Sequence, residues 1–196
     1  MSNTNRKFRV SFNSPVVLTF SIICLAALLL DFLTKGWANK TLFSVYRSSF
    51  LNPFTYFRLI GHVFGHADWE HFLGNITLIL VVGPLLEEKY GSWNIGVIMF
   101  STALVTGLVH ILLFPNTMLL GASGIVFAFI LLSSITSIKD GSIPMTFILV
   151  AVIYIGEQIF QGLFVKSNIS NLTHIVGGVL GASFGYIMNK NRIKRV

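Results

Sequence analysis

Long apolar segments recur along the whole of this 196-residue chain. A helix needs about 20 mostly apolar residues to cross a bilayer, and an α-helix satisfies all of its backbone polar groups within one segment. Charged residues make up 11% of the chain, against about a quarter in soluble domains. The sequence therefore predicts an all-α, polytopic membrane protein whose six spans cover residues 15–34, 69–86, 93–114, 121–138, 143–164 and 171–189.

Basic residues gather at the two ends of the chain, in tails at residues 1–14 and 190–196. An even number of spans puts both tails on one side, and that side then carries nine lysines and arginines against five on the other. Basic flanks are retained in the cytoplasm, and anionic headgroups attract them. The net charge of +7 thus indicates cytoplasmic tails around one membrane domain, residues 15–189, rather than a nucleic-acid partner.

One connection, residues 35–68, is much longer than the others and is rich in aromatic residues. It is too polar to span a membrane, while its amphipathic rings are typical of side chains that settle at the headgroup level. We expect this segment to fold into the outer membrane interface, with a turn at Asn52-Pro53.

The fourth apolar segment is too short for a full span. From Ser123 to Ile138 there are 16 residues, which cover about 24 Å of a hydrocarbon core about 30 Å thick. The preceding segment, residues 114–121, must supply the missing length. Irregular backbone at membrane depth needs protein or water as hydrogen-bond partners, so Ser123 is predicted to lie below the membrane surface beside a wet cavity.

Ser123 stands in the sequence Gly121-Ala-Ser-Gly124, where small residues allow a sharp turn into a helix. The first amide N–H groups of a helix lack intrahelical partners, and such donors can stabilise the oxyanion of a tetrahedral intermediate. The alternative is a patch of small residues for close helix packing. The motif taken alone favours this packing interpretation, because short glycine motifs recur by chance.

A second group of polar residues precedes and enters the second span. His62 and His66 are four residues apart, as are His71 and Asn75, so each pair would share a face if the segment is helical. Asn75 lies about one turn into an apolar span, where a polar residue indicates function. Two alternatives remain open, namely histidines that hydrogen-bond the interfacial loop, and a metal site of His62, His66 and His71 that has few carboxylates nearby.

The third group lies in the sixth span, where Gly177, Gly181 and Gly185 recur every four residues and form one smooth helix face. His174 lies on this face, one turn before Gly177. A close neighbouring helix would bring a serine hydroxyl within reach of the imidazole, as general base catalysis requires. A hydrogen bond between helices without any chemistry is an equally open interpretation.

In their order and spacing, the three groups resemble the rhomboid intramembrane serine proteases. The resemblance covers the pattern His-x3-His-x4-His-x3-Asn, then Gly-x-Ser-Gly, then His-x2-Gly-x3-Gly. It implies that Ser123 is the nucleophile and His174 the general base of a dyad. It also implies that His71 and Asn75 contribute to the oxyanion hole together with the backbone amide of Ser123, and that Gly124 completes the site beside the nucleophile.

The resemblance extends to positions around the site. It implies structural roles for His62 and His66, and it makes Glu87 the acidic residue at the cytoplasmic end of the second span. Where the family often has a tyrosine, this chain has Phe127, whose ring could still stack on His174.

The resemblance implies an endopeptidase that needs neither a cofactor nor a metal and acts within the bilayer on transmembrane segments of other proteins. Helix-weakening residues and a small residue at the cut would favour a substrate, because cleavage needs local unwinding. The expected location is a bacterial plasma membrane. A non-catalytic relative that binds client helices, and a metal or haem carrier using the histidines, are the alternatives. The intramembrane residues His110 and Glu157 match no motif.

Overall fold

The computed structural model describes residues 11–136, 145, 148–150, 152–153, 156 and 168–193. Within these residues the chain is helical, with one isolated antiparallel β-bridge between Val45 and Leu119, so the predicted all-α class is confirmed. The described helices are α1 (Pro15–Leu33), α2 (Trp37–Thr41), α3 (Pro53–Gly61), α4 (Trp69–Tyr90), α5 (Ser92–Leu113), α6 (Ser123–Ile135) and α8 (Asn168–Ile193).

Three of the helices, α1, α4 and α5, are long and apolar enough to cross a membrane. They coincide with the first three predicted spans, except that α4 continues four residues further, to Tyr90. Helix α8 contains the predicted sixth span, although its glycines and polar residues make it less apolar. Most of the predicted fifth span, 143–164, lies outside the described residues.

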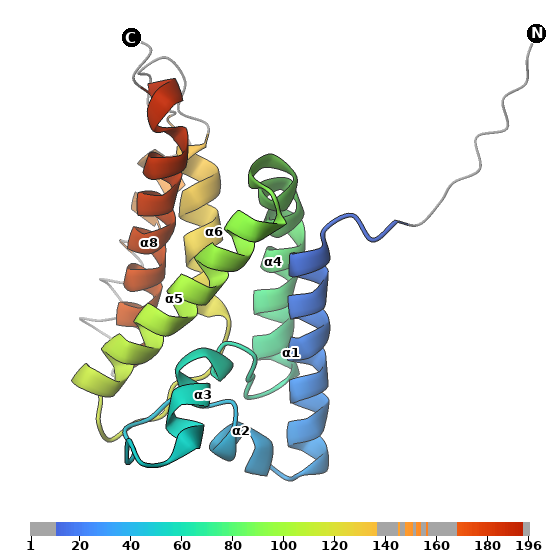
Figure 1. The fold of residues 1–196 in the computed structure, drawn as a ribbon, viewed down its shortest axis with the longest axis vertical. Coiled ribbons are helices and arrows are strands. Elements are labelled where there is room, and N and C mark those ends of the chain that lie inside the picture. The colour runs from blue at the N-terminus through green and yellow to red at the C-terminus, as the bar shows by residue number, and fades with distance from the viewer. Residues whose placement is uncertain are drawn as a thin grey trace, which may run out of the picture.

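Helix α6 lies at the centre of the bundle and contacts α4, α5 and most extensively α8. Figure 1 shows α1 beside α4, with α5 running obliquely across the bundle and α2 and α3 gathered at one end. The first turn of α1 and the last turns of α8 lie at the opposite end. With only 13 residues, α6 would be about 20 Å long, and its central place is possible because the neighbouring helices cover most of it.

The predicted interfacial connection holds two short helices, α2 and α3. The predicted turn at Asn52-Pro53 is instead the start of α3, because the Asn52 side chain accepts a hydrogen bond from the Phe54 amide at 3.0 Å and Pro53 occupies the first helical position. Sequence alone did not separate these alternatives, since proline after asparagine suits both a turn and a helix start.

Glu87 joins three helices at the end of the bundle where α1 begins. Its carboxylate accepts hydrogen bonds from the amides of Val16 and Val17, each at 3.0 Å, and from the Ser92 hydroxyl at 2.6 Å. A negative charge at a helix N-terminus satisfies its unpaired donors and interacts favourably with its dipole. Glu87 thus fixes the start of α1 against α4 and α5.

Candidate active site

An open cavity of about 400 Å³ lies between α4, α6 and α8. It brings together the four polar side chains singled out from the sequence, which come from three different helices: His71, Asn75, Ser123 and His174. The rest of its lining is apolar or glycine, and of these residues only Phe127 was predicted from the sequence to lie at the site: Gly74, Leu78, Leu119, Leu120, Val126 and Phe127.

Ser123 is the first residue of α6, and Ala122 caps the helix. The first helical hydrogen bonds run from the amides of Ile125 and Val126 to the Ala122 carbonyl, at 2.9 and 3.0 Å. The amides of Ser123 and Gly124 precede these bonds and carry the partial positive charge of the helix start. The nucleophile candidate and two backbone donors therefore occupy one helix terminus.

The segment before α6 is irregular, and its backbone bonds to other parts of the protein. Val45 and Leu119 exchange two hydrogen bonds, at 2.8 and 3.0 Å, and the Gly121 amide donates to the His62 carbonyl at 2.9 Å. Such partners are what irregular backbone at membrane depth needs. The interfacial connection thus holds the segment that leads into Ser123.

His110, which matched no motif, also holds this segment. Its Nε2 donates a hydrogen bond to the Thr117 carbonyl at 3.1 Å, and its ring stacks on Phe114 with centroids 5.6 Å apart. A single buried histidine in an apolar helix gave no signal of this contact, because its partner is a backbone carbonyl.

His71 packs directly against Gly121. A Cβ atom at Gly121 would lie 2.7 Å from both Cε1 and Nε2 of His71, and the φ angle of +122° is one that side chains rarely adopt. His71 Nδ1 accepts a hydrogen bond from the Ala67 amide at 3.4 Å, so in the neutral ring the proton is on Nε2. Gly121, two residues before Ser123, therefore leaves room for the His71 ring, which presents its Nε2–H donor there.

Asn75 lines the same cavity one helical turn after His71. The side chain is 7% exposed, and its Nδ2 has no hydrogen-bond partner within the described part of the chain. A buried donor without a partner costs about 1 to 3 kcal/mol. Asn75 therefore offers an available N–H group in the same cavity as Ser123.

His174 is held by an aromatic ring. Phe127 lies one turn after Ser123 on α6, and its ring stacks on the imidazole with centroids 4.4 Å apart and planes 8° from parallel. This bears out the prediction that Phe127 keeps the stacking position. The contact fixes the plane of the imidazole from the same helix that carries the serine.

The glycine face of α8 packs on the backbone of α6. A Cβ at Gly177 would overlap the Gly124 carbonyl oxygen, and a Cβ at Gly181 would overlap that of Ala128. Gly124 is therefore part of this helix contact rather than of the cavity lining. Because His174 lies one turn before Gly177, this close approach brings it to the serine end of α6.

His62 and His66 form contacts that hold the interfacial connection. Helix α3 ends at Gly61, so they do not share a helix face. His62 Nδ1 donates to the Arg58 carbonyl at 3.2 Å, and His66 Nδ1 donates to the Phe64 carbonyl at 3.1 Å. No group of three or more metal-ligating side chains is found among the residues described. The expected structural role of these two histidines is thus supported by their contacts.

Burial lowers the pKa of His62 and of His66 from the ordinary value of 6.5 to about 4. Above about pH 4 both imidazoles are neutral in the folded protein, whereas in the unfolded chain they take up protons below pH 6.5. The contribution of these two histidines to stability is therefore fully present above pH 6.5 and is lost as the pH falls towards 4. We expect the protonation of His62 in the unfolded chain to make the free energy of unfolding about 2 kcal/mol lower at pH 5 than at pH 7.5. Unfolding in detergent at pH 7.5 and 5 measures this, and equal stability at both pH values would contradict it.

A second hollow of about 370 Å³ adjoins the cavity and is lined by Asp68, Glu70, His71, Gly74 and Asn75. It shares His71, Gly74 and Asn75 with the first. The two together lead from the exposed start of α4 to Ser123, and the polar lining of the outer part suits water.

Comparison with known proteins adds independent information. The family model described as "Rhomboid domain" matches residues 53–191. Rhomboid-related protein 1 of Caenorhabditis elegans is 31% identical over 146 residues, 70% of this chain and 41% of that protein. Rhomboid-related protein 2 of Mus musculus is 28% identical over 142 residues, 66% of this chain and 47% of that protein. Rhomboid-like protein 11, chloroplastic, of Arabidopsis thaliana is 21% identical over 149 residues, 69% of this chain and 53% of that protein. The chain spans about half the length of these relatives.

Proposed function

Because the chain belongs to the rhomboid family, we propose that it is an intramembrane serine endopeptidase that cleaves transmembrane segments of other proteins. The observation that carries the proposal is the cavity in which Ser123 and His174 meet two N–H donors, on His71 and Asn75. The relatives' names state a family relationship and no activity, so the argument rests on these side chains.

The proposed reaction proceeds through an acyl-enzyme. Ser123 Oγ attacks the scissile carbonyl while His174 takes its proton and then delivers it to the leaving amine. The Ser123 amide, His71 Nε2 and Asn75 Nδ2 stabilise the oxyanion. Water from the adjoining hollow then hydrolyses the ester, with His174 as base. In a triad a third group orients the histidine; here the stacked Phe127 ring would do so.

The substrates proposed are membrane helices that unwind easily. The backbone carbonyl of a helical segment is engaged in its own hydrogen bonds, so attack by Ser123 requires local opening. Glycine and proline lower the cost of opening by about 1 and 3 kcal/mol. The cavity holds about 400 Å³, which is too little for an intact helix and suits a short extended stretch of chain.

A serine-directed fluorophosphonate tests the proposal against its alternative, a non-catalytic binder of client helices. The probe is expected to label the purified protein at Ser123 and to leave Ser123→Ala unlabelled, with Ser133 and Ser134 of α6 as internal controls for nonspecific reaction. The purified protein should also cut a labelled transmembrane peptide. Failure of both labelling and cutting in a folded sample would favour the binder.

Replacing Asn75 with alanine is expected to lower kcat by about 10²-fold to 10³-fold, as loss of one oxyanion donor does elsewhere, with little change in KM. The folded protein should melt no lower than wild type, because the substitution removes a buried donor that has no partner within the described residues. Kinetics on the transmembrane peptide together with a melting curve measure both effects. Unchanged kcat would remove Asn75 from the proposed oxyanion hole.

A further inference from the structure

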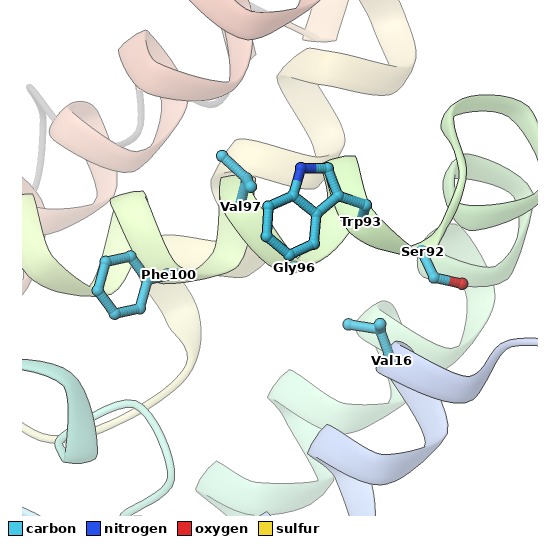
Figure 2. A pocket seen from close by; sticks show the side chains of 6 residues that line it. All are labelled: Val16, Ser92, Trp93, Gly96, Val97 and Phe100. Carbon is cyan, nitrogen blue, oxygen red and sulfur yellow. The ribbon is translucent and has the colours of Figure 1, made fainter.

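Two hollows outside the cavity of the candidate active site differ in their chemistry. One is an apolar groove of about 510 Å³ between α1 and α5, where Figure 2 shows Trp93 and Phe100 on α5 and Val16 on the facing α1. No charged side chain is among the described residues that line it. The other hollow, of about 370 Å³, adjoins the cavity and is lined by the carboxylates of Asp68 and Glu70. The second hollow can therefore select a ligand by its charge.

The two carboxylates differ in what already holds them. Asp68 caps α4, because its Oδ1 accepts a hydrogen bond from the His71 amide at 2.8 Å. Glu70 lies in the first turn of α4 and is exposed, and its carboxylate has no hydrogen bond or ion pair to any other described residue. The helix dipole favours an acid at this position, but it leaves the oxygens of Glu70 free to bind a ligand.

A buried polar group in the same hollow also points to a ligand. Asn75 lines both this hollow and the cavity that contains Ser123. Its side chain is 7% exposed, and no described residue accepts a hydrogen bond from Nδ2. A buried donor of this kind needs an acceptor. The backbone carbonyl of a peptide that lies across both hollows would supply one.

A peptide can extend from one hollow into the other because Gly74, which lines both, has no side chain to separate them. A Cβ atom added at Gly74 would meet nothing within 4 Å. Along α4, Glu70 comes five residues before Asn75, which corresponds to about 7.5 Å. An extended chain advances about 3.3 Å per residue. A side chain roughly two residues from the scissile carbonyl would therefore reach Glu70.

We propose that this hollow binds a lysine or arginine side chain of the substrate, about two residues from the bond that is cut. The carboxylates of Asp68 and Glu70 complement its positive charge, and the exposed position of both leaves the bound cation partly hydrated. The inference rests on the proposed proteolysis and names a substrate class for it, namely membrane segments with a basic residue close to the cleavage site.

Matched peptides test the proposal with the full chain. A labelled transmembrane peptide, whose cut bond is located by mass spectrometry, carries either lysine or the uncharged analogue norleucine about two residues before or after that bond. At one of these positions kcat/KM is expected to be about fivefold higher for lysine, the upper range for an exposed ion pair. The difference should lie in KM, because the charge is bound alike before and during the reaction, and it should shrink at high salt.

Charge changes on α4 separate this site from general effects. Glu70→Gln should lower the ratio of the lysine and norleucine values of kcat/KM, and Glu70→Lys should reverse the preference. Glu88→Gln is the matched control, because Glu88 is an exposed acid near the other end of α4 and lines neither hollow. The ratio should therefore stay at its wild-type value in this variant.

The outcomes distinguish this inference from the proteolysis on which it rests. Equal kcat/KM for lysine and norleucine at both positions, with cutting still lost in Ser123→Ala, would overturn the basic-residue site and leave the protease in place. An unaltered lysine preference in Glu70→Lys would overturn the site as well. If the folded wild-type protein cuts none of the peptides, the proposed proteolysis fails and the substrate class falls with it.

Discussion

Replacing Ser123 with alanine is expected to abolish cleavage of a transmembrane substrate, with kcat lowered by about 10⁴-fold or more. The methyl group cannot attack a carbonyl, while the cavity, the helix start and the Phe127 contact stay in place. Ser133→Ala is the matched control, because Ser133 lies on the same helix and its hydroxyl bonds the Ile130 carbonyl at 2.8 Å. The measurement is the rate of cutting of a labelled peptide by purified protein.

The same assay distinguishes a dyad from two independent groups. His174→Ala alone should lower kcat about as much as Ser123→Ala, and the double variant should be no slower than either, because residues that act as a unit are strongly non-additive. Cleavage retained in Ser123→Ala would refute the proposed mechanism. Losses that multiply in the double variant would refute the dyad while leaving the serine in place.

Replacing Gly181 with alanine is expected to destabilise the fold by about 3 kcal/mol or more, at the upper end of overpacking effects. A Cβ at Gly181 would overlap the Ala128 carbonyl oxygen and would lie 2.6 Å from both the carbonyl carbon and Cα of Ala128. These are backbone atoms of α6, so no side chain can move aside and the two helices must separate. Thermal unfolding in detergent measures the loss.

Gly178, three residues earlier on α8, is the matched control. A Cβ there would lie 3.7 Å from Leu131 Cγ, which is ordinary contact, and alanine is the better helix former by about 1 kcal/mol. Gly178→Ala should therefore melt at or above the wild-type temperature. Equal melting temperatures of Gly178→Ala and Gly181→Ala would show that the close approach of α6 and α8 does not limit stability.

Much of the fold could be predicted because a membrane helix makes its backbone hydrogen bonds within one segment, and such a segment is recognised by the length of its apolar run. The boundaries of α1 and α5 agree with the predicted spans to within one residue. The polar side chains of the site could be found because an amide or imidazole inside an apolar membrane helix is energetically costly and rare, so its presence indicates a function. The glycine spacing of α8 likewise indicated close helix contact.

The contacts that position the site were not predictable from local patterns. His110 bonds a backbone carbonyl seven residues away, and the bridge of Val45 with Leu119 joins segments far apart in the sequence. A hydrogen bond to a backbone group can be made by any residue type at the partner position, so the sequence does not indicate it. The resemblance suggested where Glu87 lies, but its bonds to the first amides of α1 depend on how α1, α4 and α5 meet.

The contact between α6 and α8 also sets when the proposed enzyme becomes active during its own synthesis. The ribosome adds Ser123 about fifty residues before His174, and at about 5 to 20 residues per second this interval lasts several seconds. Throughout it, the nascent chain carries a nucleophile without its base. Under the proposed mechanism, the nascent chain therefore does not cleave peptide bonds near the translocon before α8 has been inserted and has packed on α6.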